Sequence, residues 1–491
     1  MRPKKGGLPE TREPSGRIMR QMSAKSRRAV AVVAVLFLLV AGGLAAVYLT
    51  NRREVTTSSA AAYAAYREGV ENNQRFYRKE AQVAFARALA LDPNFAMAML
   101  RLAGLSNSDQ RTSLVERARR LRGRLTDRER LFVDMAYAEV QGKTEERNKL
   151  ARAIFDKYPD DVDAAMILCN IEMSQGRAER ALEIYSGLLA RDPNNAAVYN
   201  SIGYYHAWRG DYDRAIENLR KYQFMAPDQA NPYDSLGEVQ AYSGHYDEAI
   251  ANLNRALALK PDFFESSFHL GVAYEGKGDS VKAVSYYETA AREAVTDGRR
   301  MDLLGIALRG ALFAGDREAT REVAQRIADL PKGKNSEILR SFADVALDLA
   351  EGRDAEAERR LTEIKPKLLA AYEKEAKGSQ RKPHFSGWNA LMARIKEKQG
   401  KLDEAIVFYE ANANPPNAWD SFEGRRWVFE ARAHLAELLA RKGDLDRAEK
   451  LLAENKKWNP SWAPTRSAEL VVEQLRREKV LAASAGPTTQ H

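Results

Sequence analysis

Apolar and small residues recur along most of the chain three and four positions apart, the spacing of one face of an α-helix. In the segment 196–229 this pattern predicts two helices. The first presents Tyr199, Ile202, Gly203 and Ala207. The second presents Ala215, Leu219 and Tyr222. We expect Gly210 to end the first helix in a left-handed conformation, Asp211 to cap the second, and Pro227 to stop it.

The predicted pair of helices returns every 34 residues. Turn glycines lie at Gly142, Gly176, Gly210, Gly244 and Gly278. Closing prolines lie at Pro159, Pro193, Pro227 and Pro261. Small residues in the two helices lie at Cys169, Gly203, Gly237 and Gly271, and at Ala181, Ala215, Ala249 and Ala283. Because these series share one register, the chain is predicted to be an array of stacked helix pairs.

Looser copies extend the array in both directions. Residues 63–93 and 430–460 keep the phase of the apolar positions. Later turn glycines follow at wider steps of 37 to 48 residues, at Gly315, Gly352, Gly400 and Gly443. Counted in this way, the chain holds about eleven helix pairs.

The best-preserved copies carry a recognisable motif. It reads Y-x-x-L-G over Tyr233–Gly237 and D-E-A-I-A-N-L-N-R-A-L-A-L-K-P over Asp247–Pro261. Between residues 128 and 297 the pattern resembles the tetratricopeptide repeat family. Three positions depart from that family's usual tyrosine: Glu172, His206 and Gln240. The resemblance implies an all-α fold, a right-handed α-solenoid of helix pairs whose first helices line a concave groove.

Composition and proline content divide the repeat region further. The predicted order is divergent repeats at 55–127, the regular array at 128–297, divergent repeats at 298–364, a linker or extended helix at 365–388, C-terminal repeats at 389–470, and a helix end with a disordered tail at 471–491. The loop around Pro415 and Pro416 carries three large aromatic residues nearby, Trp419, Phe422 and Trp427. Packing of this loop on neighbouring helices is the favoured interpretation, and a partner-binding patch is the alternative.

Residues 29–50 form a 22-residue run without a charged side chain. A helix of that length crosses a hydrocarbon core of about 30 Å. The run is longer than the apolar part of a signal peptide, which favours an uncleaved transmembrane anchor over a secretory signal. The preceding residues 1–28 carry nine basic and two acidic side chains. The positive-inside rule therefore predicts a disordered cytoplasmic tail, a single-pass inner-membrane helix and a periplasmic or extracellular repeat domain.

The formal net charge of +9 belongs almost entirely to this N-terminal segment. Residues 1–28 carry +7 and the membrane flank 52–54 carries +1, which leaves +1 for residues 55–491. A nearly neutral repeat domain gives no electrostatic basis for binding nucleic acid. The charge therefore reports membrane topology, and nucleic acid is not an expected partner.

The sequence does not predict an enzyme, a cofactor or a metal site. No two of the six histidines are spaced to place two ligands on one helix face. Cys169 takes a position that neighbouring copies fill with glycine, so it is expected to be a buried small residue rather than a reactive thiol. His206 is expected to be a packing side chain rather than an acid–base group.

The resemblance implies which first-helix residues face the concave groove. They are Asn200, Tyr204, Trp208, Asp234, Glu238, Tyr242 and Phe268. This set is aromatic and acidic, which favours a protein or peptide partner with neutral to basic side chains. The alternative interpretation is that these side chains fill the narrow inside of the superhelix.

The sequence thus predicts a membrane-anchored scaffold that binds peptide or protein partners outside the cytoplasm. Segment 231–238 is also similar to repeat regions that follow the membrane span of bacterial transmembrane serine/threonine kinases, although no kinase domain is present. The alternative function is a self-assembling structural protein of the cell envelope, in which the repeats form homo-oligomers.

Overall fold

The computed structural model describes residues 55–375, 384–415 and 424–484. The chain divides into two compact units, 1–57 and 58–491, and every described helix belongs to the second. The predicted membrane helix at 29–50 and its basic tail lie outside the described residues. Within the described ranges, no helix combines the length and the apolar character needed to cross a membrane.

The described chain is all-α, with 23 α-helices, one 3₁₀ turn at Arg122–Arg124 and no strand. The first seven pairs are α3 and α4 (Ala60–Gln74, Arg78–Leu91), α5 and α6 (Ala96–Gly104, Ser108–Arg120), α7 and α8 (Asp127–Val140, Thr144–Lys157), α9 and α10 (Val162–Ser174, Ala178–Arg191), α11 and α12 (Ala196–Arg209, Tyr212–Met225), α13 and α14 (Ala230–Tyr242, Tyr246–Leu259), and α15 and α16 (Phe264–Lys277, Ser280–Glu293). Four pairs follow: α17 and α18 (Asp297–Phe313, Arg317–Ala328), α19 and α20 (Lys334–Ala350, Asp354–Glu375), α21 and α22 (Ser386–Lys398, Leu402–Ala413), and α23 and α24 (Arg425–Arg441, Leu445–Trp458). The last described helix is α25 (Ala463–Ser484).

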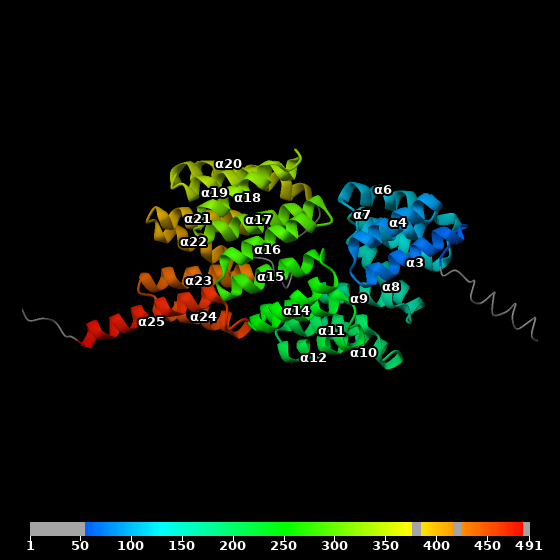
Figure 1. Cartoon of the computed structure of the whole chain (residues 1–491), viewed down its shortest axis with the longest axis horizontal. Coiled ribbons are helices and arrows are strands. Elements are labelled where there is room, and N and C mark those ends of the chain that lie inside the picture. The colour runs from blue at the N-terminus through cyan, green and yellow to red at the C-terminus, as the bar shows by residue number, and fades with distance from the viewer. Residues whose placement is uncertain (1–54, 376–383, 416–423, 485–491) are drawn as a thin grey trace, which may run out of the picture. The chain divides into compact units, whose positions relative to one another are not determined.

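Each helix packs against its neighbours in the chain, so the pairs follow one another as an α-solenoid (Figure 1). The eleven described pairs agree with the number expected from the spacing of the turn glycines. The predicted fold class is therefore confirmed for the described chain. A single pair cannot bury its apolar face alone, and this explains why the array is continuous.

The turns within the pairs adopt the left-handed backbone conformation that was predicted for their glycines. All nine predicted turn glycines, from Gly142 to Gly443, adopt φ angles between +70° and +89°. At the turn after α11, Gly210 has φ of +80°, and the Asp211 side chain accepts a hydrogen bond from the Arg214 amide, as expected of a cap. A side chain at these glycines would strain the left-handed backbone.

Small residues let the two helices of a regular pair approach closely. A Cβ atom added to Gly237 would lie 2.6 Å from Leu253 Cγ and 3.1 Å from the Ala249 carbonyl oxygen. Gly203 and Gly271 are equally confined by Leu219 and Tyr287. Cys169, at the same place in the α9–α10 pair, is fully buried, and its Sγ lies 3.6 Å from a carbonyl oxygen of α10. The small-residue series is therefore a packing requirement.

Several helices of the later pairs are longer, which contributes to the wider glycine steps. Helices α17, α19 and α23 have 17 residues, where the first helices of the regular pairs have 13 or 14. Helix α20 extends to 22 residues and contains Pro366. The segment 365–388, predicted to be a linker or an extended helix, thus begins inside α20 and ends inside α21, with 376–383 outside the described residues.

Both ends of the array touch its middle. At the N-terminal end, Lys79 Nζ lies 2.8 Å from Glu293 Oε2 of α16, and Lys260 Nζ of α14 lies 2.6 Å from Glu80 Oε1. At the C-terminal end, the Tyr246 hydroxyl donates to Asn459 Oδ1 at 3.0 Å. Residues about 180 to 215 positions apart in the sequence thus lie side by side. These contacts are made at the ends of the second helices α4, α14, α16 and α24.

Candidate functional site

The seven residues predicted to line the groove lie on three consecutive first helices, α11, α13 and α15. Five of them are buried: Asn200, Asp234, Glu238, Tyr242 and Phe268. The other two, Tyr204 and Trp208, are partly buried. The structure thus brings the predicted set together, with most of its surface covered by other residues of this chain. A role in partner binding stays a prediction.

A buried polar network joins the predicted residues of α11 and α13 to α15. Asp234 Oδ1 accepts a hydrogen bond from Ser266 Oγ at 2.7 Å and lies 3.0 Å from His269 Nδ1. The other ring nitrogen of His269 lies 3.5 Å from Glu238 Oε1. Both ring nitrogens of His269 thus face carboxylates of α13.

Tyr204 completes this network from α11. Its hydroxyl donates a hydrogen bond to Glu238. Burial and the neighbouring carboxylates raise the pKa of Tyr204 well above its ordinary value, so the phenol stays a donor. The network therefore holds two carboxylates, an imidazole and a phenol between successive repeats.

Glu265 adds a third carboxylate to this part of the inner face. It lies at the start of α15, and its Oε1 is 3.1 Å from Nε of Arg78 on α4. Burial raises the pKa of Glu265 to about 7, against the lowering effect of Arg78. The charge of this side chain thus changes close to neutral pH.

A second cluster forms where α23 meets α15 and α16. The Arg426 side chain is 2% exposed, and its Nη1 donates to the Tyr287 hydroxyl at 2.7 Å and to Glu275 Oε2 at 3.1 Å. Its guanidinium carbon lies 5.3 Å from the ring centre of Phe268 and 3.8 Å from that of Trp427. The buried Arg426 guanidinium is thus stabilised by an opposite charge, by hydrogen bonds and by aromatic rings together.

Arg425 makes the neighbouring contact with α11. Its guanidinium donates to the carbonyl oxygens of Ala207 and Trp208, at the C-terminal end of that helix. The same group lies 4.0 Å from the ring centre of Trp458. Carbonyl groups at a helix C-terminus attract a cation, which explains why the Arg425 guanidinium lies at this end of α11.

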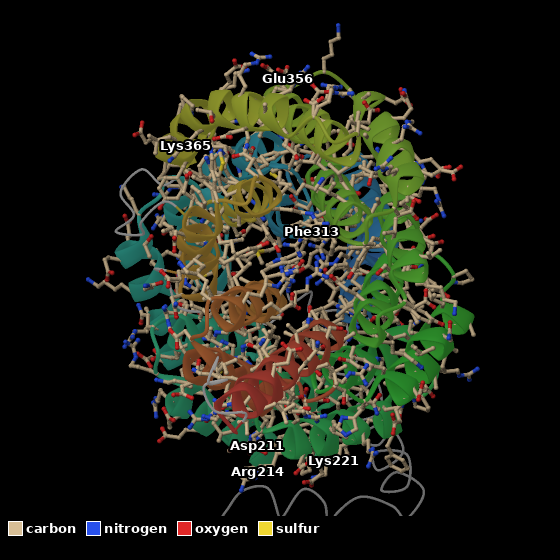
Figure 2. All side chains as sticks on the ribbon, turned by 90° about the vertical axis from the view of Figure 1, so that its left-hand side faces the viewer. Asp211, Arg214, Lys221, Phe313, Glu356 and Lys365 are labelled. Carbon is tan, nitrogen blue, oxygen red and sulfur yellow. The ribbon has the colours of Figure 1, made fainter. Side chains whose placement is uncertain are left out.

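The inner face beyond α15 is rich in arginine. Arg309 lies 3.0 Å from the ring centre of Trp427 and 2.8 Å from Glu430 Oε2, and burial lowers the pKa of Arg309. Arg394 lies over the ring of Phe313 at 4.8 Å. Figure 2 shows Phe313 inside the ring of helices, whereas Asp211, Arg214 and Lys221 lie at its outer edge.

His434 of α23 lies in the same arginine-rich region. Its ring stacks on Tyr409 with centres 5.4 Å apart. Burial, with a contribution from Arg394 and Arg309, lowers the pKa of His434 to about 4. The imidazole is therefore neutral at pH 7 and acts as a packed aromatic ring.

Sequence reasoning missed the contribution of α23 to this site. Arg425, Arg426 and Trp427 were adjacent to a proline-containing loop, which is the only local signal that they carry. Trp427 lies on α23 and packs against Arg309 and Arg426. Trp419 and Phe422 lie outside the described residues, so the packing of the loop stays a prediction. Tyr287 was also missed, because it lies on a second helix rather than on a first helix.

Other reactive side chains are used in packing. Burial raises the pKa of the Cys169 thiol to about 12, so the thiol is protonated at pH 7. Burial also lowers the pKa of His206, whose Nδ1 lies 3.4 Å from Asp211 Oδ2. In the part of the chain that the structure describes, no three His, Cys, Asp or Glu side chains converge to hold a metal ion.

Family models for tetratricopeptide repeats match much of the regular array. One matches residues 141–196 and 168–232, a second matches 237–278 and a third matches 266–301. These matches identify tetratricopeptide repeats in this part of the chain. None of the curated protein sequences matches the chain significantly.

Several solved structures match the chain at low identity. The Cut9–Hcn1 hetero-tetramer of APC/C matches with 14% identity and a TM-score of 0.43, over 84% of this chain and 76% of that chain. A tetratricopeptide repeat protein from Parabacteroides merdae matches with 13% identity and a TM-score of 0.36, over 61% and 97%. MamA matches with 24% identity and a TM-score of 0.27, over 32% and 93%.

Proposed function

We propose that this chain, which contains tetratricopeptide repeats, is a scaffold that binds other proteins through the inner face of its repeats. Such repeats generally mediate protein–protein interactions. The observation that carries the proposal is the gathering of aromatic and carboxylate side chains on α11, α13 and α15. Aromatic anchors with a few charged groups are typical of binding surfaces that recognise one partner chemistry.

The proposal includes a membrane anchor at residues 29–50, with the N-terminus cytoplasmic and the repeats periplasmic or extracellular. It rests on the uncharged 22-residue run and on the net charge of +7 before it. The likeness of segment 231–238 to repeat regions of bacterial transmembrane kinases points in the same direction. Protease digestion of intact spheroplasts tests the topology, because repeats outside the cytoplasm would be cut while the tail is protected.

Partner binding is tested by crosslinking in intact cells followed by pull-down of the full chain. The test variant carries alanine at Tyr204, Trp208 and Tyr242, and the control variant is Phe224→Ala, whose side chain is 85% exposed on α12. We expect the test variant to lose its captured proteins and the control to keep them. Circular dichroism must show equal helix content, because Tyr242 is buried. Unchanged capture by a folded test variant would contradict the proposal.

Self-assembly is the second candidate function, favoured by the last described helix. Helix α25 exposes Leu470, Val480 and Leu481, each more than 60% accessible. Exposed apolar side chains on one helix of an array can associate with another copy. Sedimentation of the full chain in detergent separates the two functions, since a monomer argues against self-assembly.

A further inference from the structure

The Arg426 side chain lies on the inner face of α15 and α16, in the position that the side chain of a bound ligand would take. Its buried guanidinium is held by three residues of the regular repeats, Phe268, Glu275 and Tyr287, which we call the arginine cage. Arg426 itself comes from α23, 151 positions beyond Glu275 in the sequence. The cage and its occupant thus belong to distant parts of the chain.

The cage has the chemistry of a guanidinium site. Glu275 supplies a carboxylate oxygen at 3.1 Å and the Tyr287 hydroxyl a neutral oxygen at 2.7 Å. That hydroxyl also donates to Glu275 Oε2 at 2.5 Å, which fixes both acceptors. The Phe268 and Tyr287 rings lie 5.3 Å and 5.5 Å from the guanidinium carbon. A planar group with several donors fits such a site better than the compact ammonium of lysine.

Charged groups of both signs surround the cage. Asp234, Glu238 and Glu265 lie on the same run of inner-face helices. His269 lies between two of these carboxylates, Arg78 pairs with Glu265, and the Arg299 guanidinium lies 5.0 Å from the ring centre of Phe268. The groups that recognise a partner's arginine are therefore Glu275 and Tyr287 themselves, rather than a general acidic surface.

We propose that the arginine cage is a binding site for an arginine side chain of a partner protein, and that Arg426 fills it within the same chain until the partner takes its place. This inference rests on the proposed scaffold function and names the chemistry of the partner segment. The expected segment has an arginine followed by an aromatic residue, because Trp427 stacks on the guanidinium of Arg426.

The intramolecular occupant explains why the site is filled in the free protein. A tethered side chain has an effective concentration in the millimolar range, so an equal ligand in solution competes poorly with it. Helix α23 also packs on α22, α24 and α25, and these contacts do not involve the cage. Helix α23 can therefore keep its own neighbours when Arg426 leaves.

The test uses the full chain in detergent and a fluorescent peptide with the sequence of residues 424–430, Gly-Arg-Arg-Trp-Val-Phe-Glu. The test variant is Arg426→Ala, which empties the cage. The matched control is Arg441→Ala at the other end of α23, where the side chain is 49% exposed. We expect the peptide to bind Arg426→Ala about tenfold more tightly than wild type or the control, as read by anisotropy. A peptide with lysine in place of the second arginine should bind about tenfold more weakly.

Equal binding of the two peptides by a folded Arg426→Ala, or no gain over wild type, would overturn the inference. If circular dichroism shows that Arg426→Ala is unfolded, Arg426→Lys replaces it. Lysine fits the cage less well than arginine, so the arginine peptide should still bind this variant more tightly than wild type, whereas the lysine peptide should not. Binding of the arginine peptide and of the lysine peptide to this variant is then compared in the same way. Capture of proteins in cells is measured separately, so the scaffold function can stand when the peptide result is negative.

Discussion

The two halves of the inner face carry opposite charges. On α13 and α15 the buried or partly buried ionisable side chains are chiefly carboxylates, Asp234, Glu238 and Glu265, with one imidazole between them. On α17 and the later first helices they are chiefly guanidiniums, Arg309, Arg394, Arg425 and Arg426. The halves meet at the contact between Arg426 and Glu275.

This difference shows how the array tolerates charges away from water. An isolated buried charge is costly, but a charge that meets its opposite with hydrogen bonds and aromatic rings is compensated. Arg425 and Arg426 of the second half take carbonyl oxygens, a carboxylate and a ring of the first half as partners, whereas Arg309 pairs with Glu430 of its own half. The two halves are thus complementary, and separating them would leave charges unpaired on both sides.

The largest effect is expected from the residue that joins the halves. Arg426→Ala leaves Glu275 without its buried cation, and we expect the free energy of unfolding to fall by about 3 kcal/mol. Urea denaturation followed by circular dichroism measures it, with the exposed Arg441→Ala as control at about 0.5 kcal/mol. A loss as small as that of the control would show that the halves are not held together by this contact.

The acidic half should lose stability as the pH rises. The pKa of Glu265 is raised to about 7 from its ordinary value of 4.5, so its favourable contribution is complete below pH 4.5 and lost as the pH rises through 7. Glu265→Gln should therefore be about 1–3 kcal/mol more stable than wild type at pH 8, with the gain vanishing near pH 4. Denaturation across this pH range checks it. The exposed Glu473→Gln should show no such trend.

The basic half should show the opposite pH dependence. The pKa of His434 is lowered to about 4 from 6.5, so its contribution is present above pH 6.5 and lost as the pH falls towards 4. His434→Phe and His434→Gln both remove the titrating ring, and each should flatten the fall in stability by about 1–3 kcal/mol between these values. A slope equal to that of wild type in both variants would contradict the burial of a neutral imidazole.

The smallest effect is expected at the N-terminal contact, where the charges are exposed. Lys79 bridges Asp262 and Glu293 with a side chain that is 38% accessible. Lys79→Ala should cost about 0.5 kcal/mol, because water and salt screen such pairs. Denaturation in low salt and in 1 M salt measures it, and the difference should disappear in high salt. A larger loss of stability that does not change with salt would contradict this expectation, because it would show that the contact behaves as a buried ion pair.

The sequence predicted the units of this fold well because their signals are local. Gly210 ends its helix and Asp211 caps the next one through contacts within a few residues. The small-residue series at Cys169 and Gly237 likewise reports packing inside one pair. The candidate site was predicted only in part. Phe268 and Glu238 were identified from their helix positions, but the contact of Phe268 with Arg426 of the distant helix α23 leaves no local pattern.

By itself the sequence determined that the chain is an array of helix pairs, where each pair turns, and which faces carry carboxylates and aromatic rings. These properties follow from periodicity and from the backbone preferences of glycine and proline. Only the tertiary structure decided that both ends return to the middle and that Arg425 and Arg426 reach α11 and α15. That outcome depends on small rotations between pairs, which accumulate along the array and are fixed by the packing of every pair on the next.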